Sequence, residues 1–97
     1  MNLAYIHCRD IIWTDMLLLC YKDLLCQMSP SIDQTVTVDQ MRVKLDRILA
    51  DDHYHIYLAF DGDYVVATCT LLLEETFLHN CALNAHLENI VVDSGYR

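Results

Sequence analysis

The sequence is poor in glycine, proline and positive charge. Two glycines and one proline among 97 residues leave no low-complexity segment and indicate a densely packed chain, possibly one that packs against another chain. Six basic residues stand against 14 acidic ones, which gives a formal net charge of −8 with no long basic patch. This balance argues against a nucleic acid or an anionic membrane surface as a partner.

Long apolar runs and paired cysteines are also missing. The longest apolar run near the start, residues 16–21, is far shorter than the ~20 residues that span a bilayer, so we expect no transmembrane span. The five cysteines are odd in number and contain no C-x-x-C pair, and no signal peptide precedes them. We therefore expect reduced thiols and a cytoplasmic protein.

Apolar residues are in excess, at 55% of the chain, which at this length indicates one small domain with a single core. Residue periodicity predicts an α+β fold with the order β-α-α-β-β-β and a mixed, mainly antiparallel sheet. Residues 74–85 lack a clear period and are expected to form a loop or a bulged strand continuation. The predicted elements are strands at residues 3–9, 53–60, 64–73 and 88–92 and helices at residues 15–28 and 38–50, with a hairpin turn at residues 61–63.

Capping signals precede both predicted helices. Thr14 and Asp15 supply N-cap chemistry for the first helix. Thr37, with Gln40 three residues later, has the form of a capping box for the second.

The two helices differ in their apolar surfaces. The first is apolar around most of its circumference, so we expect it to touch both its own sheet and a partner subunit. The second is amphipathic, and Arg42 and Asp46 are expected to pair on its solvent side. Trp13, just before the first helix, is expected to pack as a hydrophobic staple.

Two histidines could mark a metal site. His53 and His55 lie two residues apart in a predicted strand, hence on one face, and could present two imidazoles to a metal ion. No third or fourth ligand sits at a telling distance in the sequence. Surface or hydrogen-bonded histidines are the default interpretation, so we expect no metal.

Two further groups could carry acid, base or nucleophile chemistry. Cys81 with His79 and Glu88 could act as a thiol nucleophile with a base and an orienting group, although a buried free cysteine is commoner. Glu74 and Glu75 end a predicted strand, where a solvated strand end is the simpler interpretation than an acid/base pair.

Several segments together carry a family resemblance. They are Arg9, LCQMS at residues 25–29, TVTVDQM at 35–41, ATCTLLLE at 67–74, FLHNC at 77–81 and ENIVV at 88–92, and His79 and Glu88 are nine residues apart. With these segments the sequence resembles the glucosamine 6-phosphate N-acetyltransferases of the GNAT superfamily, in which similar segments occur in the same order with the same spacing of His and Glu.

The resemblance implies a fold and a reaction. Residues 1–97 would be the N-terminal part of a GNAT (acyl-CoA N-acyltransferase) domain, with Arg97 as the first residue of a pyrophosphate-binding loop. Such enzymes transfer acetyl from acetyl-CoA, without a metal, to the amine of glucosamine 6-phosphate, a step toward UDP-N-acetylglucosamine. A homodimer is also implied. The amine attacks the thioester directly in a ternary complex, beside a strand whose free rim pairs with the cofactor's pantetheine arm.

The resemblance also assigns roles to residues. Glu88 and Asn89 take the catalytic positions, and Asn89 departs from the family's Asp by losing a charge. The residues matching the substrate-contact positions are Ser29, Thr76, Phe77, Leu78, His79, Glu88, Asn89 and Ile90. Those matching the cofactor-contact positions are Ile90, Val91, Val92 and Arg97.

An alternative interpretation treats the chain as a half-domain. Because the remainder of the pyrophosphate loop is absent, we expect the 97-residue chain alone to be inactive. It could instead be a non-catalytic interaction module that self-associates, or pairs with another protein, through its exposed last strand.

Overall fold

The computed structural model describes residues 3–29 and 35–97, which form four strands and three helices in an α+β fold. The strands form one sheet in the order β1-β2-β3-β4, and every neighbouring pair is antiparallel, so the expected mixed sheet is wrong for the described residues. The elements are β1 (Leu3–His7), α1 (Asp15–Met28), α2 (Val38–Leu49), β2 (Tyr54–Asp61), β3 (Tyr64–Glu75), α3 (Leu78–Cys81) and β4 (Leu83–Val92), with 3₁₀ turns at Cys8–Asp10 and Ser94–Tyr96.

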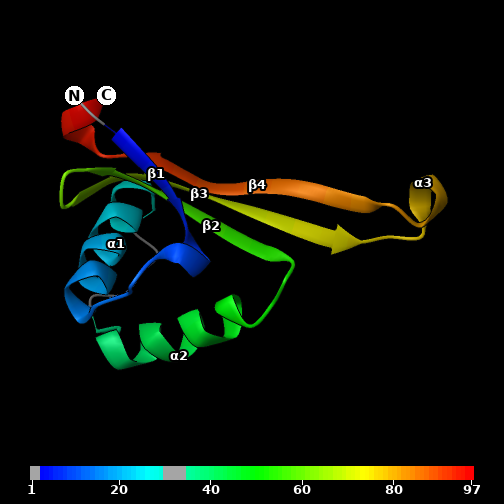
Figure 1. Ribbon diagram of the computed structural model, residues 1–97, viewed down its shortest axis with the longest axis horizontal. Coiled ribbons are helices and arrows are strands. Elements are labelled where there is room, and N and C mark those ends of the chain that lie inside the picture. Colours follow the sequence, from blue (N-terminus) through cyan, green and yellow to red (C-terminus); the bar gives the residue numbers. More distant parts are fainter. Residues whose placement is uncertain (1–2, 30–34) are drawn as a thin grey trace.

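Helices α1 and α2 lie on the same side of the sheet (Figure 1). The β3–β4 hairpin projects well beyond the end of β2 and carries α3 at its tip, while both chain ends lie at the opposite end of the molecule (Figure 1). No helix in the described residues is long and apolar enough to cross a membrane. The fold therefore has a helix-covered body and a two-stranded arm.

The predicted caps form as expected. Thr14 accepts a hydrogen bond from the Leu17 amide at 3.1 Å, which satisfies one of the free N–H groups at the start of α1. At α2, the Thr37 side chain accepts from the Gln40 amide at 3.1 Å, and the Gln40 side chain accepts from the Thr37 amide at 2.8 Å. The predicted capping box is confirmed.

The core lies between α1, α2 and the helix side of the sheet. Leu18 and Leu58 are completely or almost completely buried within it. Trp13 and Leu18 belong to the same cluster, as a staple across the start of α1 requires, and the Trp13 ring meets Tyr21 edge-on at 5.6 Å. The Trp13 indole donates to the Cys8 carbonyl at 3.0 Å, so its polar atom is satisfied inside the core.

Several strand boundaries differ from the predictions: β2 runs one residue later at both ends and β3 runs two residues further, and two other differences change the layout. The first strand ends at His7 instead of the predicted Arg9, and a 3₁₀ turn follows it. β4 starts at Leu83, five residues before the predicted Glu88, because it pairs with the end of β3 along the whole arm. The predicted hairpin between β2 and β3 is confirmed, and Gly62 supplies the positive φ (60°) that its turn needs.

Arg42 makes a different ion pair from the one expected. Its guanidinium lies 2.8 Å from the Asp15 carboxylate and also donates to the Trp13 carbonyl at 2.8 Å, so it joins α2 to the start of α1 rather than pairing with Asp46 on its own helix. The side of α1 turned away from the sheet exposes Met16, Leu19 and Met28. Contact of that side with a partner subunit stays a prediction.

Arg9 holds the C-terminal end of α2. Its guanidinium donates to the carbonyl of Leu49 at 3.2 Å, to that of Tyr54 at 3.0 Å and to that of Asp51. The last carbonyls of a helix have no partner within the helix, so a cation placed there satisfies them and interacts favourably with the helix dipole. Arg9 thereby ties β1, α2 and β2 together.

We expect Arg9→Ala to lower the free energy of unfolding by about 1–2 kcal/mol, because three carbonyls lose a charged donor. Arg9→Lys should lose less, since the ammonium keeps the charge but cannot reach all three carbonyls. Urea denaturation measures both changes, with Arg47→Ala on the exposed side of α2 as the control. Equal losses for Arg9→Ala and Arg47→Ala would contradict this role.

Candidate functional site

A β-bulge interrupts β4 at Asn89. Thr70 pairs with Glu88 and Thr68 pairs with Val91, so Cys69 on β3 faces two residues on β4, Asn89 and Ile90. Asn89 has a φ of 52°, a left-handed conformation that asparagine tolerates better than most residues. The extra residue bends the strand and shifts the alternation of its faces by one position.

The bulge turns side chains on both sides of it toward the helices. Glu88, Thr70 and Ile56 form one row across β4, β3 and β2, and Ile56 belongs to the core. Val91 follows the bulge and is also on the helix side, because it pairs with the buried Thr68. Without the extra residue, Glu88 and Val91 would lie on opposite faces.

The last strand is buried on one face only. Val91 is 5% exposed, whereas Ile90 is 59% and Val92 is 38% exposed. Within the described residues β4 is an edge strand that pairs only with β3. The other rim of β4 carries no strand within residues 3–29 and 35–97.

The open rim presents the backbone of Val92. The Asp93 amide donates to the Val66 carbonyl at 2.7 Å, and in an antiparallel pair alternate residues point their amides toward the partner strand. The amide and carbonyl of Val92 therefore point toward the open rim. The Arg97 side chain already donates to the Val92 carbonyl at 3.0 Å.

The segment after β4 is fastened to the body of the fold. The Gln27 side chain donates to Asp93 at 2.9 Å and accepts from the Ser94 amide at 2.9 Å, which joins α1 to the end of β4. The Tyr96 hydroxyl donates to the Asp61 carboxylate at 2.6 Å. These bonds fix the direction in which Arg97 leaves the sheet.

A cavity of about 610 Å³ lies between the helices and the sheet, next to the bulge. Its lining is mostly apolar, and its polar groups come from α1, α2, β2, β3 and the bulge of β4. The described residues that line it are Leu18, Tyr21, Leu25, Val36, Gln40, Met41, Lys44, Leu45, Ile48, Tyr54, Ile56, Thr70, Glu88 and Asn89. The predicted catalytic residues Glu88 and Asn89 therefore share one cavity wall.

Two buried hydroxyl groups also belong to the cavity lining. Thr70 is 5% exposed, and its hydroxyl lies beside that of Tyr21. Tyr21 is 8% exposed, and burial raises the pKa of its hydroxyl more than the nearby hydroxyls of Thr68 and Thr70 lower it. The Tyr21 hydroxyl therefore stays protonated at neutral pH.

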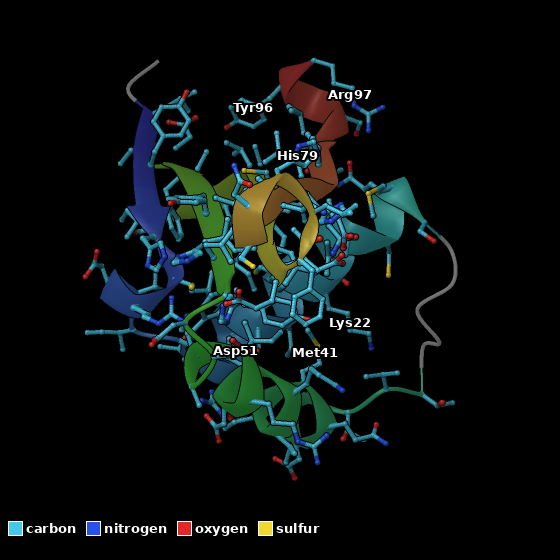
Figure 2. The ribbon with its side chains drawn as sticks, turned by 90° about the vertical axis from the view of Figure 1, so that its right-hand side faces the viewer. Lys22, Met41, Asp51, His79, Tyr96 and Arg97 are labelled. Carbon is cyan, nitrogen blue, oxygen red and sulfur yellow. The ribbon has the colours of Figure 1, made fainter. Side chains whose placement is uncertain are left out.

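The predicted substrate-contact segment lies away from this cavity. Thr76 to His79 occupy the hairpin tip, where Phe77 is 93% exposed. Leu83 pairs with Glu75 next to the tip and comes five residues before Glu88. Five residues of strand separate the tip from Glu88 by roughly 17 Å. Figure 2 looks at the tip end-on, with His79 on it and Met41 of α2 below.

The tip does not assemble the possible cysteine nucleophile. His79, Asn80 and Cys81 all have left-handed backbones, with φ of 53°, 63° and 64°, and they form an exposed turn. Glu88 lies at the other end of the arm, so the arrangement of Cys81, His79 and Glu88 is wrong as a catalytic group within one chain. Ser29 ends α1, donating its amide to the Leu25 carbonyl at 3.1 Å, and does not line the cavity.

His53 and His55 do not converge on one point. His53 lies just before β2. Its hydrogen bond to Glu75 (2.9 Å) is the main cause that raises its pKa, and its hydrogen bond to Asp51 is a smaller one. His55 meets His7 at 2.8 Å between ring nitrogens, and burial, His55 and Arg9 together lower the pKa of His7. No group of three possible metal ligands occurs in the part of the chain that the structure describes.

No family model matches the sequence. Among solved structures, glucosamine-6-phosphate N-acetyltransferase from Arabidopsis thaliana is similar with a TM-score of 0.78 at 21% identity, over 100% of this chain and 64% of its own. A protein of Agrobacterium tumefaciens assigned as an acetyltransferase has a TM-score of 0.75 at 23% identity, over 100% of this chain and 62% of its own. A predicted acetyltransferase of Clostridium acetobutylicum, solved with acetyl-CoA, has a TM-score of 0.67 at 14% identity, over 99% of this chain and 63% of its own.

These similarities establish the fold. The chain has the architecture of the N-acyltransferase (GNAT) fold, as the resemblance implied. It spans less than two thirds of the length of each of these neighbours. At these identities the roles of individual residues stay predictions.

We expect Asn89→Val to lower the free energy of unfolding by about 1–2 kcal/mol, because a β-branched residue is strained at a φ of 52°. Asn89→Gly should be nearly neutral, since glycine adopts this conformation freely. Chemical denaturation measures both, with Asn84→Val in the regular part of β4 as the matched control. The bulge would be unimportant for stability if all three variants unfolded alike.

Proposed function

We propose that this chain forms the cofactor-strand and acceptor-cavity portion of an N-acetyltransferase that transfers acetyl from acetyl-CoA to the amine of glucosamine 6-phosphate. The observation that carries the proposal is the meeting of three features at Asn89: the bulge, the open rim of β4 and the cavity that contains Glu88. The GNAT fold supports acyl transfer, and the Arabidopsis neighbour acts on this sugar phosphate.

The open rim suits a cofactor that adds to the sheet. Pantetheine contains two amide groups, and an extended segment with amides can pair with an unpaired strand edge. Val92 offers its amide there, while Ile90 and Val91 complete the strand beside it. Arg97 would have to leave the Val92 carbonyl, which would free its guanidinium for a cofactor phosphate. The Clostridium neighbour, solved with acetyl-CoA, supports this cofactor.

The cavity suits the amine substrate. The amine nitrogen attacks the thioester carbon, the N–C bond forms, the C–S bond breaks, and the amine loses one proton while the thiolate of CoA gains one. Glu88, whose carboxylate lies on the cavity wall, is the group that accepts or orients the amine proton. Asn89 cannot accept a proton through its amide, so it positions the amine, and a backbone amide of β4 steadies the developing oxyanion.

The hairpin tip implies a second copy. Thr76, Phe77, Leu78 and His79 lie at the end of the arm, which projects beyond the helix-covered body (Figure 1), and they do not line the cavity. They can therefore contact substrate only in the cavity of another subunit, which fits the expected homodimer. We also place the protein in the cytoplasm, where its five free cysteines would stay reduced and where the product would lead to UDP-N-acetylglucosamine.

A second candidate is a non-catalytic module that associates through the arm. Phe77, Leu83 and Leu87 are 93%, 49% and 64% exposed, and the rim of β4 beside them is unpaired within the described residues. Exposed apolar side chains next to a free strand edge are a site for association.

We expect the longest natural form of the chain to release CoA thiol from acetyl-CoA when glucosamine 6-phosphate is added. Glu88→Gln should lower kcat by roughly 100-fold, because a positioned proton acceptor contributes about that much. Glu74→Gln, on the arm and outside the cavity lining, is the control that should retain activity. Absence of turnover with this or any related amine would contradict the acetyl transfer, and a monodisperse, folded monomer of the 97-residue chain in light scattering would contradict the non-catalytic module.

A further inference from the structure

One cation of the cavity has no part in the reaction just described. Met41, Leu45 and Ile48 form the apolar stripe of α2 that faces the core. Lys44 lies three residues after Met41 and four before Ile48, so helical geometry places it at the edge of this stripe. Its side chain is exposed and lines the cavity.

Lys44 and Glu88 both line the cavity, and both are exposed at its solvent side. Lys44 comes from α2 and Glu88 from β4, and α2 faces the sheet from one side (Figure 1). Neither side chain takes part in an ion pair with a residue that the structure describes. The cavity thus has a positive group on its helix wall and a negative group on its sheet wall.

Four of the other five Lys and Arg residues bind groups elsewhere. Arg9 binds carbonyls at the end of α2, Arg42 binds Asp15, Arg97 binds the Val92 carbonyl, and Lys22 donates to the Val36 carbonyl at 2.9 Å. Lys44 is the one Lys or Arg among the described residues that line the cavity. In a chain with a net charge of −8, such a cation decides where an anion can bind.

Hydroxyl groups lie on the sheet and α1 walls of the same cavity. Thr70 is 5% exposed, and its hydroxyl lies beside that of Tyr21, so a ligand hydroxyl that reaches this point meets two buried hydroxyls. The protonated hydroxyl of Tyr21 adds a second donor.

We infer that the cavity binds a hydroxylated primary amine that carries an anionic group at its other end, and that Lys44 binds the anion. Glu88 takes the amine end, and the hydroxyls of Thr70 and Tyr21 contact hydroxyls of the ligand. This inference deepens the proposed acetyl transfer and rests on it. It makes Lys44 the residue that selects a phosphorylated amino sugar over an unphosphorylated one.

The test compares glucosamine 6-phosphate with glucosamine in the longest natural form of the chain. Lys44→Gln should lower the preference in kcat/KM for the phosphorylated sugar by roughly tenfold, the loss of one charge-assisted contact, mainly through KM. Lys44→Arg should keep the preference, because it keeps the charge. Arg47→Gln, which removes the same charge from α2 outside this cavity, should leave it unchanged.

A second measurement separates the two proposals. Calorimetric titration with each sugar, without acetyl-CoA, reports binding alone, and Thr70→Val should weaken the binding of both sugars while keeping the preference for phosphate. Binding that depends on Lys44 without any turnover would overturn the acetyl transfer and support the anion site. A preference that is the same in the wild type and in Lys44→Gln would overturn the anion site, and absence of both binding and turnover would overturn both proposals.

Discussion

The left-handed backbone of Asn89 is the constraint on which the site depends. It adds one residue to β4, and that residue brings Glu88 and Val91 to the same side of the sheet. Val91 then closes the core while Glu88 reaches the cavity. A regular strand would satisfy one of these requirements and not the other, because side chains of a regular strand alternate. One local conformation therefore serves packing and the proposed chemistry together.

The cavity also requires that the helices stay in place above the sheet. Arg42 fastens α2 to the start of α1 through Asp15, and Arg9 fastens the end of α2 to β1 and β2. Gln27 joins α1 to the residues after β4. These contacts are polar and their residues do not line the cavity, so they hold its walls without filling it with side chains. Lys44 lies at the edge of the apolar stripe of α2 and adds a charge to the lining.

Local signals predicted the body of the fold well. The capping residues Thr14 and Thr37 and the turn at Gly62 act over a few residues, so their effect is visible in the sequence. The length of β4 and the partner of Arg42 depend on segments far apart in the chain. Residues 74–85 lack alternation because the arm is exposed on both faces over much of its length, and a bulge cannot be read from one strand alone.

The candidate site was predicted in part. The family resemblance pointed to Glu88 and Asn89, which do share a cavity wall, but it also grouped them with Thr76 to His79, which lie at the hairpin tip. Thr70, Tyr21 and Lys44 were missed because the cavity is assembled from several elements, and each of these residues looks ordinary in its own segment. The position of Lys44 at the edge of an apolar stripe was the one signal available in the sequence.

The central claim is that the free rim of β4 receives acetyl-CoA, and amide hydrogen exchange at Val92 tests it most directly. In the free protein the Val92 amide should exchange quickly, whereas that of Val91, whose residue pairs with Thr68, should be protected. Saturating acetyl-CoA should slow exchange at Val92 and leave Val91 unchanged. Exchange at Val92 that is equally fast with and without acetyl-CoA would contradict the account.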